Sequence, residues 1–514
     1  MLAAIRSAAV LGIDAYDVTV EVDVANGLPQ WFIVGLPANA VKESRERVSA
    51  ALINAGFDVP SRRITVNLAP ADIRKEGTAF DLPIALGVLV GTGVLKPEQV
   101  QQCLVVGELG LDASIRPVRG ALSIARKLSS SGGAKGSVLI LPAANVAEAS
   151  LVRDVRLGAP SSLGELVGWL MRGTIPPPVI APRVHADDDL LDLADVAGQE
   201  GAKRALAIAA AGSHGILLVG PPGAGKTMLA RRLPAILPSL TDAEALEVTA
   251  VHSVAGMLDA ASGSVIRRPF RAPHHSISTA GLVGGGSSPR PGEVSLAHHG
   301  VLFLDELLEF PRSVLEALRQ PMEDGTVTIA RASASLKFPA RFALAAAMNP
   351  CPCGHSGSTL PCVCPAADVV KYRARLSGPL ADRIDLHVYV PPVALSRLSA
   401  RDTSARSVDV RANVERARLC QRERYKGDGT CNARAAGRWL ETHGDLESGA
   451  RALLTSAGER LHLSARAFHR VLRVARTISD LDGIRTISTA QIAEALGYRP
   501  RAADTSDGGS RRHE

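Results

Sequence analysis

A glycine-rich segment at residues 220–227 carries the clearest chemistry in the sequence. It reads Gly-Pro-Pro-Gly-Ala-Gly-Lys-Thr, follows the apolar run 216–219 and precedes a helical pattern. Glycines at this spacing let successive backbone N–H groups converge on phosphate oxygens at the start of a helix. Lys226 supplies a positive charge to the outer phosphates, and the Thr227 hydroxyl supplies a ligand for Mg²⁺. The sequence therefore predicts a nucleoside triphosphate site formed by Gly220, Pro221, Pro222, Gly223, Ala224, Gly225, Lys226 and Thr227.

Polar residues follow two further apolar runs. Asp305 and Glu306 come directly after Val301-Leu-Phe-Leu, and Asn349 ends the run 342–348. In open α/β sheets, ligands bind at the carboxyl ends of the strands. We expect Asp305 to hold Mg²⁺, Glu306 to polarise the attacking water, and Asn349 to orient that water. Together with the glycine-rich segment, these residues predict triphosphate hydrolysis.

Four cysteines lie within fourteen residues directly after Asn349, as two Cys-x-Cys pairs separated by eight residues. Four thiolates in one short loop can form a tetrahedral Zn²⁺ site, and we favour structural zinc at Cys351, Cys353, Cys362 and Cys364. Free or redox-active thiols, and a ligand set that uses His355, remain as alternatives.

Two histidine pairs, His274-His275 and His298-His299, are a second candidate for metal binding. Adjacent side chains on a strand point to opposite faces, so neither pair would chelate as it stands. We expect ordinary packing or polar contacts for both pairs.

These side chains need a parallel sheet to bring them together. From 190 to 392, apolar runs alternate with helical patterns, the βαβ rhythm of such a sheet. Residues 1–172 mix strand-like and helical stretches, and 393–500 is helical throughout. The Pro-rich segment 173–189 predicts an extended linker, and the polar tail 501–514 predicts disorder. The expected fold class is α/β, with three domains.

Composition limits the class of protein. The chain has 514 residues, 46% of them hydrophobic and 21% charged, which is ordinary globular chemistry. No apolar run is long enough for a transmembrane helix, no secretory signal is recognisable, and seven cysteines do not suggest a secreted disulfide framework. We therefore expect a cytoplasmic protein with no membrane partner.

The positive charge is concentrated near the end of the chain. Residues 391–514 hold 22 Lys and Arg against 15 Asp and Glu, which accounts for the whole net charge of +7. Such a surplus indicates either a footprint for a polyanion or a solvated Arg-rich helical surface.

Over nearly its whole length the sequence resembles the YifB/ComM family of magnesium-chelatase-like AAA+ ATPases. The most specific matching segments are 268–276, 281–286, 289–307 and 376–386. The resemblance implies ATP and Mg²⁺ as ligands and a P-loop AAA+ core at 190–392. It also implies a helical lid of the magnesium-chelatase C-terminal type at 393–500.

The resemblance also implies three polar roles around the nucleotide. Asn349 matches the sensor 1 position, and Arg383 matches the arginine finger, which acts on the γ-phosphate bound by a neighbouring subunit. Arg466 matches sensor 2, although Arg470 and Arg473 lie close enough to compete for that role. Since an arginine that acts in trans requires a ring, a hexamer is implied.

Two insertions distinguish this family, and in related ring motors such loops face the central pore. One insertion lies within the helix 2 region at 265–286, and the other is a hairpin before sensor 1 at 326–339. Their basic residues would follow DNA phosphates without reading sequence, since aromatic side chains for base stacking are sparse. The alternative is pairing with nearby acids. The basic residues are Arg267, Arg268, Arg271, Arg331 and Lys337.

The N-terminal domain is similar to the Lon-protease type, a ribosomal S5 domain 2-like fold. The matching stretches are 74–83 and 107–120. A protease of that kind needs a serine activated by a lysine. Here the serine position is Ala79 and the lysine position is Leu122, while Thr78 lies one residue away. We therefore expect a domain without peptidase activity.

The resemblance implies a DNA motor of the branch-migration or helicase type, acting in recombination or transformation on single-stranded or branched DNA. A magnesium-chelatase-like metal-insertion subunit is one alternative, although that subunit normally lacks the Lon-like domain. An AAA+ chaperone that remodels protein partners is the other alternative.

Overall fold

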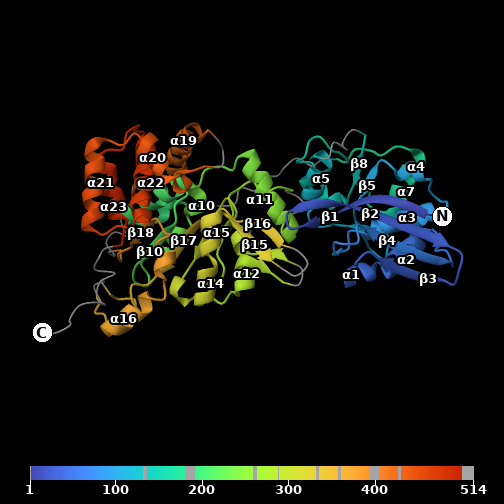
Figure 1. Ribbon diagram of the computed structural model, residues 1–514, viewed down its shortest axis with the longest axis horizontal. Helices are drawn as coiled ribbons and strands as arrows, with labels where there is room; N and C mark the ends of the chain where they lie inside the picture. Colours follow the sequence, from blue (N-terminus) through green and yellow to red (C-terminus); the bar gives the residue numbers. More distant parts are fainter. Residues whose placement is uncertain are drawn as a thin grey trace.

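The computed structural model describes residues 2–130, 136–179, 191–258, 263–286, 289–330, 335–356, 360–393, 405–426 and 430–500. These residues form an N-terminal α/β domain, a central domain and a C-terminal group of helices, arranged in that order along an elongated molecule (Figure 1). The expected linker at 173–189 lies partly outside the described residues, and the expected tail at 501–514 lies wholly outside them.

The N-terminal domain is built on a seven-stranded mixed sheet. Strand β2 (Asp14–Ala25) alternates buried and half-buried residues because successive side chains point to opposite faces, as its period-two pattern predicts. Helix α3 (Asp81–Gly91) packs on β1 (Leu2–Leu11) and β2 so closely that a Cβ on Gly87 would lie 2.4 Å from Cγ2 of Val22. In spatial order the strands are β3 (Gln30–Val34), β4 (Arg63–Ala69), β2 (Asp14–Ala25), β1 (Leu2–Leu11), β5 (Cys103–Val105), β8 (Val138–Ile140) and β9 (Arg156–Gly158).

Helices cover this sheet, and a short ribbon extends from it. The other helices are α1 (Asn39–Lys42), α2 (Ser44–Asn54), α4 (Pro97–Val100), α5 (Ala121–Ser130), α6 (Val146–Ala149) and α7 (Leu163–Arg172). The ribbon pairs β6 (Glu108–Leu109) with β7 (Ile115–Arg116).

The central domain contains a five-stranded parallel sheet. Its spatial order is β11 (Phe270–Arg271), β14 (Val301–Leu304), β17 (Ala343–Met348), β10 (Ile216–Val219) and β18 (Leu386–Tyr389). Alternate residues of each strand enter different cores: Leu218 lies in one core and Leu217 in the other. The sheet is thus buried on both faces, which explains why its strands read as continuous apolar runs.

Helices cover both faces of the central sheet. One core includes α8 (Glu200–Gly212), α9 (Lys226–Ala230), α10 (Leu233–Ile236), α19 (Ser407–Tyr425) and α22 (Ala465–Asp482). The other includes α12 (Thr279–Val283), α13 (Glu293–Leu296), α14 (Arg312–Ala317), α17 (Gly378–Ala381) and the hairpin of β15 (Thr326–Ala330) and β16 (Ser335–Pro339). The remaining elements are α11 (Asp242–Ala255), α15 (Arg319–Asp324), α16 (Ala366–Arg373), α20 (Gly437–His443), α21 (Ser448–Arg460), α23 (Thr489–Gly497), β12 (Gly284–Gly285) and β13 (Arg290–Pro291).

A buried polar network joins the C-terminal helices to the sheet. His214, just before β10, contacts Asp385 (Nδ1–Oδ2 2.9 Å) and Thr477 of α22 (Nε2–Oγ1 2.7 Å). Arg470 of α22 lies 3.5 Å from the other oxygen of Asp385. Burial acts to raise the pKa of Asp385, but His214 and Arg470 outweigh it, and the pKa is lowered. The carboxylate therefore stays ionised and holds α22 against the sheet.

Several arginines of the C-terminal helices are used internally. Arg424 and Arg476 both pair with the buried carboxylate of Asp480, and Arg204 of α8 pairs with Asp482. Part of the positive surplus therefore stabilises the packing of these helices.

Of the helices in the described ranges, none combines the length and the hydropathy that crossing a membrane requires.

Candidate functional site

Three neighbouring strands deliver the predicted residues to one edge of the central sheet. Val219 pairs with Met348, and Leu304 pairs with Ala346. Because the strands are parallel, the residues that follow them, Gly220, Asp305 and Asn349, emerge at the same edge.

Glycine geometry shapes the P-loop, residues 220–227. Gly223 (φ +76°) and Gly225 (φ +88°) adopt left-handed conformations that favour glycine. Gly220 is needed for a different reason, since a Cβ there would lie 2.3 Å from the carbonyl oxygen of Val390. Helix α9 begins at Lys226, so its N-terminal N–H groups face the loop, as anion binding requires.

The structure brings the predicted phosphate and Mg²⁺ residues together. Lys226 Nζ donates to the carbonyl oxygens of Gly220 (2.7 Å) and Pro221 (2.9 Å) and to Oδ1 of Asn349 (3.0 Å). Thr227 Oγ1 donates to Oδ2 of Asp305 at 2.7 Å. Partial burial lowers the pKa of Lys226, although Asp305 and Glu306 act in the opposite direction.

This donor set fits a magnesium-bound triphosphate. The Thr227 hydroxyl and the Asp305 carboxylate are adjacent oxygen donors, the kind of ligand that Mg²⁺ prefers. Lys226 and the start of α9 offer positive charge and N–H groups for phosphate oxygens. The fit rests on side chains from the segments that follow β10, β14 and β17, which meet at one point.

Glu306 has a neighbour that the sequence did not reveal. Its backbone is left-handed (φ 51°), and its carboxylate is exposed toward the loop that follows β11. From that loop, Nδ1 of His275 lies 3.8 Å from Oε2 of Glu306. The expectation of ordinary packing or polar contacts is consistent with this contact but did not identify Glu306 as the partner. The sequence carried no signal for this contact, because His275 reaches Glu306 only through the pairing of β11 with β14.

The two predicted arginine roles stay predictions. Arg383 is largely buried, donates to the carbonyl oxygen of Pro379 (2.6 Å) and pairs with Glu323 of α15. Arg466 is exposed in the first turn of α22, whereas its competitor Arg470 is buried against Asp385.

Two arginines of the first insertion form ion pairs with acidic residues of the same chain, so their charges are already used. Arg268 pairs with Glu244 (2.7 Å), and Arg271 pairs with Glu293 (2.6 Å). For Arg268 and Arg271, pairing with nearby acids, the alternative to contact with DNA phosphates, is therefore the correct prediction. Lys337 of β16 is exposed, while Arg331 lies outside the described residues.

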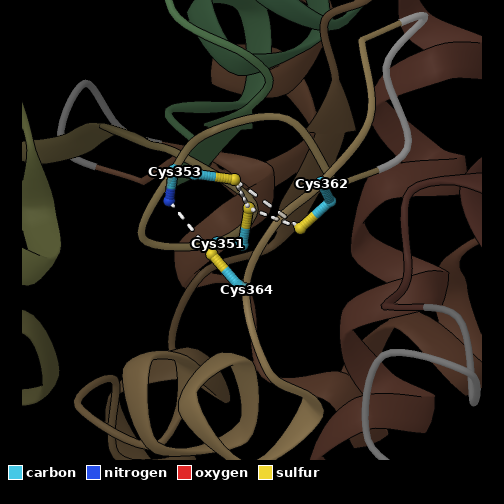
Figure 2. Close-up of side chains that lie close together, drawn as sticks. All are labelled: Cys351, Cys353, Cys362 and Cys364. Atoms are coloured by element: carbon cyan, nitrogen blue, oxygen red, sulfur yellow. Dashed lines mark hydrogen bonds between the residues drawn. The ribbon is translucent and has the colours of Figure 1, made fainter.

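The four predicted cysteines do converge (Figure 2). The sulfur of Cys351 lies 3.4 Å from that of Cys353 and 3.7 Å from that of Cys362, and Cys353 and Cys362 are 3.6 Å apart. Together with Cys364, all four sulfurs lie within 4.8 Å of one another. Hydrogen bonds from backbone N–H groups lower the pKa of Cys353 to about 6, and the N–H of His355 contributes more than that of Val363.

His298 and His299 make the polar contacts expected of them, but the strand geometry assumed for the pair was wrong. The pair follows α13 instead of lying on a strand, and His299 has a φ of 55°. Both Nε2 atoms therefore reach the same oxygen of Glu247, at 2.9 and 2.8 Å. The three side chains are within ligand distance, yet Nδ1 of His298 already accepts from the backbone N–H of Arg341. Their hydrogen bonds account for the cluster as a structural network.

This network predicts acid sensitivity. Burial lowers the pKa of His298 to about 4, although Glu247 acts in the opposite direction. The unfolded chain takes up this proton near pH 6.5, so stability falls as the pH drops from 6.5 toward 4, by about 3 kcal/mol. The hydrogen bonds from His298 and His299 also lower the pKa of Glu247, which adds a loss below about pH 4.5.

Chemical denaturation between pH 7 and pH 4 measures this effect. A His298→Gln variant, which keeps an N–H donor but does not titrate, is expected to show a flatter pH dependence than the parent. Equal slopes for the two proteins would contradict the assignment.

In the N-terminal domain, Thr78 Oγ1 donates to Glu108, and Leu122 is fully buried in α5. The contact to a carboxylate is not the lysine activation that a Lon-type serine requires. Absence of peptidase activity remains a prediction.

Three family models match successive parts of the chain. "Subunit ChlI of Mg-chelatase" matches residues 20–145, and "Magnesium chelatase, subunit ChlI" matches 192–398. "Magnesium chelatase, subunit ChlI C-terminal" matches 404–499.

Similar proteins extend over nearly the full length. The competence protein ComM of Haemophilus influenzae is 45% identical over 506 residues, which is 97% of this chain and 97% of that protein. The protein YifB of Escherichia coli is 40% identical over 507 residues, with 97% of each chain covered. The magnesium-chelatase 38 kDa subunit of Rhodobacter capsulatus is 29% identical over 171 residues, 30% of this chain and 49% of that subunit.

Proposed function

Because this chain belongs to the ComM/YifB family of magnesium-chelatase-like AAA+ proteins, we propose that it is an ATP-hydrolysing ring motor that moves DNA strands. One observation carries the ATPase part. Lys226, Thr227, Asp305 and Asn349 meet at one edge of the central sheet, with Glu306 beside them. Those side chains are the ones that phosphoryl transfer to water needs.

Each side chain has a defined task in hydrolysis. The P-loop N–H groups and Lys226 hold the phosphates, and Thr227 and Asp305 hold Mg²⁺, which when bound neutralises charge on the phosphate oxygens. Glu306 accepts a proton from the attacking water, and Asn349 orients that water from the neighbouring strand. His275, whose Nδ1 lies 3.8 Å from Oε2 of Glu306, positions the Glu306 carboxylate.

Completion of the site requires a second copy of the chain. In the proposed ring, a hexamer, Arg383 leaves Glu323 and reaches the γ-phosphate held by the adjacent subunit. Arg466, exposed at the start of α22, would sense the nucleotide from the helical domain.

The DNA part rests on the family and on surface charge. The Haemophilus relative is named a competence protein, and competence concerns the uptake of DNA. In this chain, exposed Lys337 on the hairpin of β15 and β16, together with the basic C-terminal region, supports contact with a phosphate backbone. The substrate we propose is single-stranded or branched DNA, bound without sequence readout.

ATP turnover with and without DNA tests the proposal. We expect single-stranded or branched DNA to stimulate turnover, with a stimulation that falls steeply as salt rises. The protein should migrate the branch of a synthetic four-way junction and release its strands as two duplexes, and this should require ATP. Lys226→Ala should abolish both activities, while Lys42→Ala, an exposed lysine of the N-terminal domain, should leave both unchanged.

A charge reversal at Lys337 separates the motor from the ATPase. Lys337→Glu should weaken DNA stimulation while basal turnover stays at the parental level. Turnover that ignores every DNA form would overturn the DNA part and leave the ATPase. Stimulation by a chelatase partner or by unfolded protein would instead favour metal insertion or protein remodelling.

A further inference from the structure

We propose that Cys351, Cys353, Cys362 and Cys364 bind one Zn²⁺, and that this metal site braces the P-loop. The sulfur geometry is the first support. Thiolates about 2.3 Å from a tetrahedral zinc lie about 3.8 Å from one another, whereas a disulfide needs about 2 Å. The three sulfur separations of 3.4, 3.6 and 3.7 Å match the metal spacing.

Backbone donors around the sulfurs are the second support. The N–H of Cys353 donates to Sγ of Cys364 (3.3 Å), and the N–H of Ser356 donates to Sγ of Cys351 (3.2 Å). Such hydrogen bonds stabilise thiolates and orient them toward a metal. Figure 2 shows the four side chains converging from two arms of one loop. The four sulfurs are therefore placed as a four-thiolate zinc site requires.

The loop contacts the P-loop directly. Gly354 (φ +82°), between the first two ligands and the rest of the loop, packs on Pro222, and a Cβ on Gly354 would lie 2.4 Å from its Cδ. At the other end of the first arm, Cys351 is fully buried two residues after Asn349, whose Oδ1 accepts from Lys226. The loop thus meets the nucleotide site at two points.

These contacts give zinc a mechanical role that rests on the proposed ATP site. With the metal bound, the loop is fixed between its two arms, so Gly354 supports Pro222 and Asn349 is held toward Lys226. Without the metal, four like-charged or weakly bonded sulfurs no longer hold the arms together. The P-loop then loses its support, and nucleotide affinity falls.

Metal content is measured first, on the full-length protein purified without chelator. We expect about one zinc per chain, the stoichiometry of a four-thiolate site. Substituted Co²⁺ should give the visible absorption of a tetrahedral thiolate site. Cys362→Ser and Cys364→Ser should lose the metal, whereas Cys420→Ser, an exposed cysteine of α19, should retain it. Parent protein without zinc, or with oxidised cysteine pairs in its intact mass, would overturn the metal site.

Nucleotide affinity is measured next, with a fluorescent ADP. We expect the Kd to rise about five- to tenfold in the two zinc-free variants, the size of one lost hydrogen bond. Stripping zinc from the parent with a mercurial reagent and a chelator should give the same rise. Re-addition of thiol and Zn²⁺ should reverse it, which separates metal loss from misfolding.

The outcomes distinguish the two proposals. Zinc loss that leaves the Kd unchanged would overturn the brace and keep the metal site. Parent protein that carries zinc but binds no nucleotide would overturn the ATP site, and the brace with it.

Discussion

Glu306→Gln is expected to bind ATP with parental affinity while turning it over about 10²–10⁴-fold more slowly, the usual contribution of a general base. The glutamine keeps the size and polarity of the side chain but cannot accept a proton from water. In the proposed site the P-loop N–H groups and Lys226 hold the phosphates, and Thr227 and Asp305 hold Mg²⁺; the substitution leaves all of them in place. The substitution should therefore lower the rate of ATP hydrolysis while the affinity for ATP stays at the parental value.

Single-turnover hydrolysis and a fluorescent-nucleotide titration measure the two quantities. Glu309→Gln, three residues further along and paired with Arg375, is the matched control and should keep parental turnover. A Glu306→Gln protein that hydrolyses ATP within threefold of the parent would contradict the assigned role.

The second large effect is expected at Arg383, where replacement by alanine should lower turnover by about 10³–10⁵-fold, the range for an arginine finger. Because Arg383 is proposed to act on the nucleotide of a neighbouring subunit, the loss should be rescued in trans. A mixture of Arg383→Ala and Lys226→Ala chains pairs an intact P-loop with an intact Arg383 at some interfaces. That mixture should hydrolyse ATP although neither variant does so alone.

Arg383 also pairs with Glu323 within its own chain, so a structural effect needs its own control. Glu323→Gln removes the pair while keeping the arginine and should retain most of the activity. Arg312→Ala, at an exposed arginine of α14, should be neutral. Two results together would assign Arg383 to packing. The mixture would fail to restore the ATP turnover that Arg383→Ala loses, and Glu323→Gln would lose turnover to the same extent.

The convergence of the P-loop with Asp305 and Asn349 was predictable because its signal is local. A glycine-rich turn between an apolar run and a helix, and acids directly after another apolar run, each fix a strand end. Parallel pairing then forces those ends to one edge, which is how Asn349 came within 3.0 Å of Lys226. The convergence of the four cysteines was predictable for the same reason, since they lie in one short loop.

Contacts that depend on long-range packing were not predictable. His275 reaches Glu306 only because β11 lies beside β14, and His298 and His299 face Glu247 only because α11 packs near α13. Arg268 and Arg271 read as phosphate ligands in the sequence, but the fold places carboxylates beside them. Spacing along a chain does not reveal such partners.

The contact of His214 with Asp385 and Thr477 couples the C-terminal helices to the sheet edge, so that the two move together. Asp385 lies two residues from Arg383, so a rotation of α22 either breaks this buried contact or displaces the chain that carries the arginine. Breaking this contact would leave the buried Asp385 carboxylate without its histidine partner, which costs more free energy than moving the chain. In the ring proposed above, a swing of the helices in one protomer would therefore be transmitted through Arg383 to the nucleotide site of the next protomer.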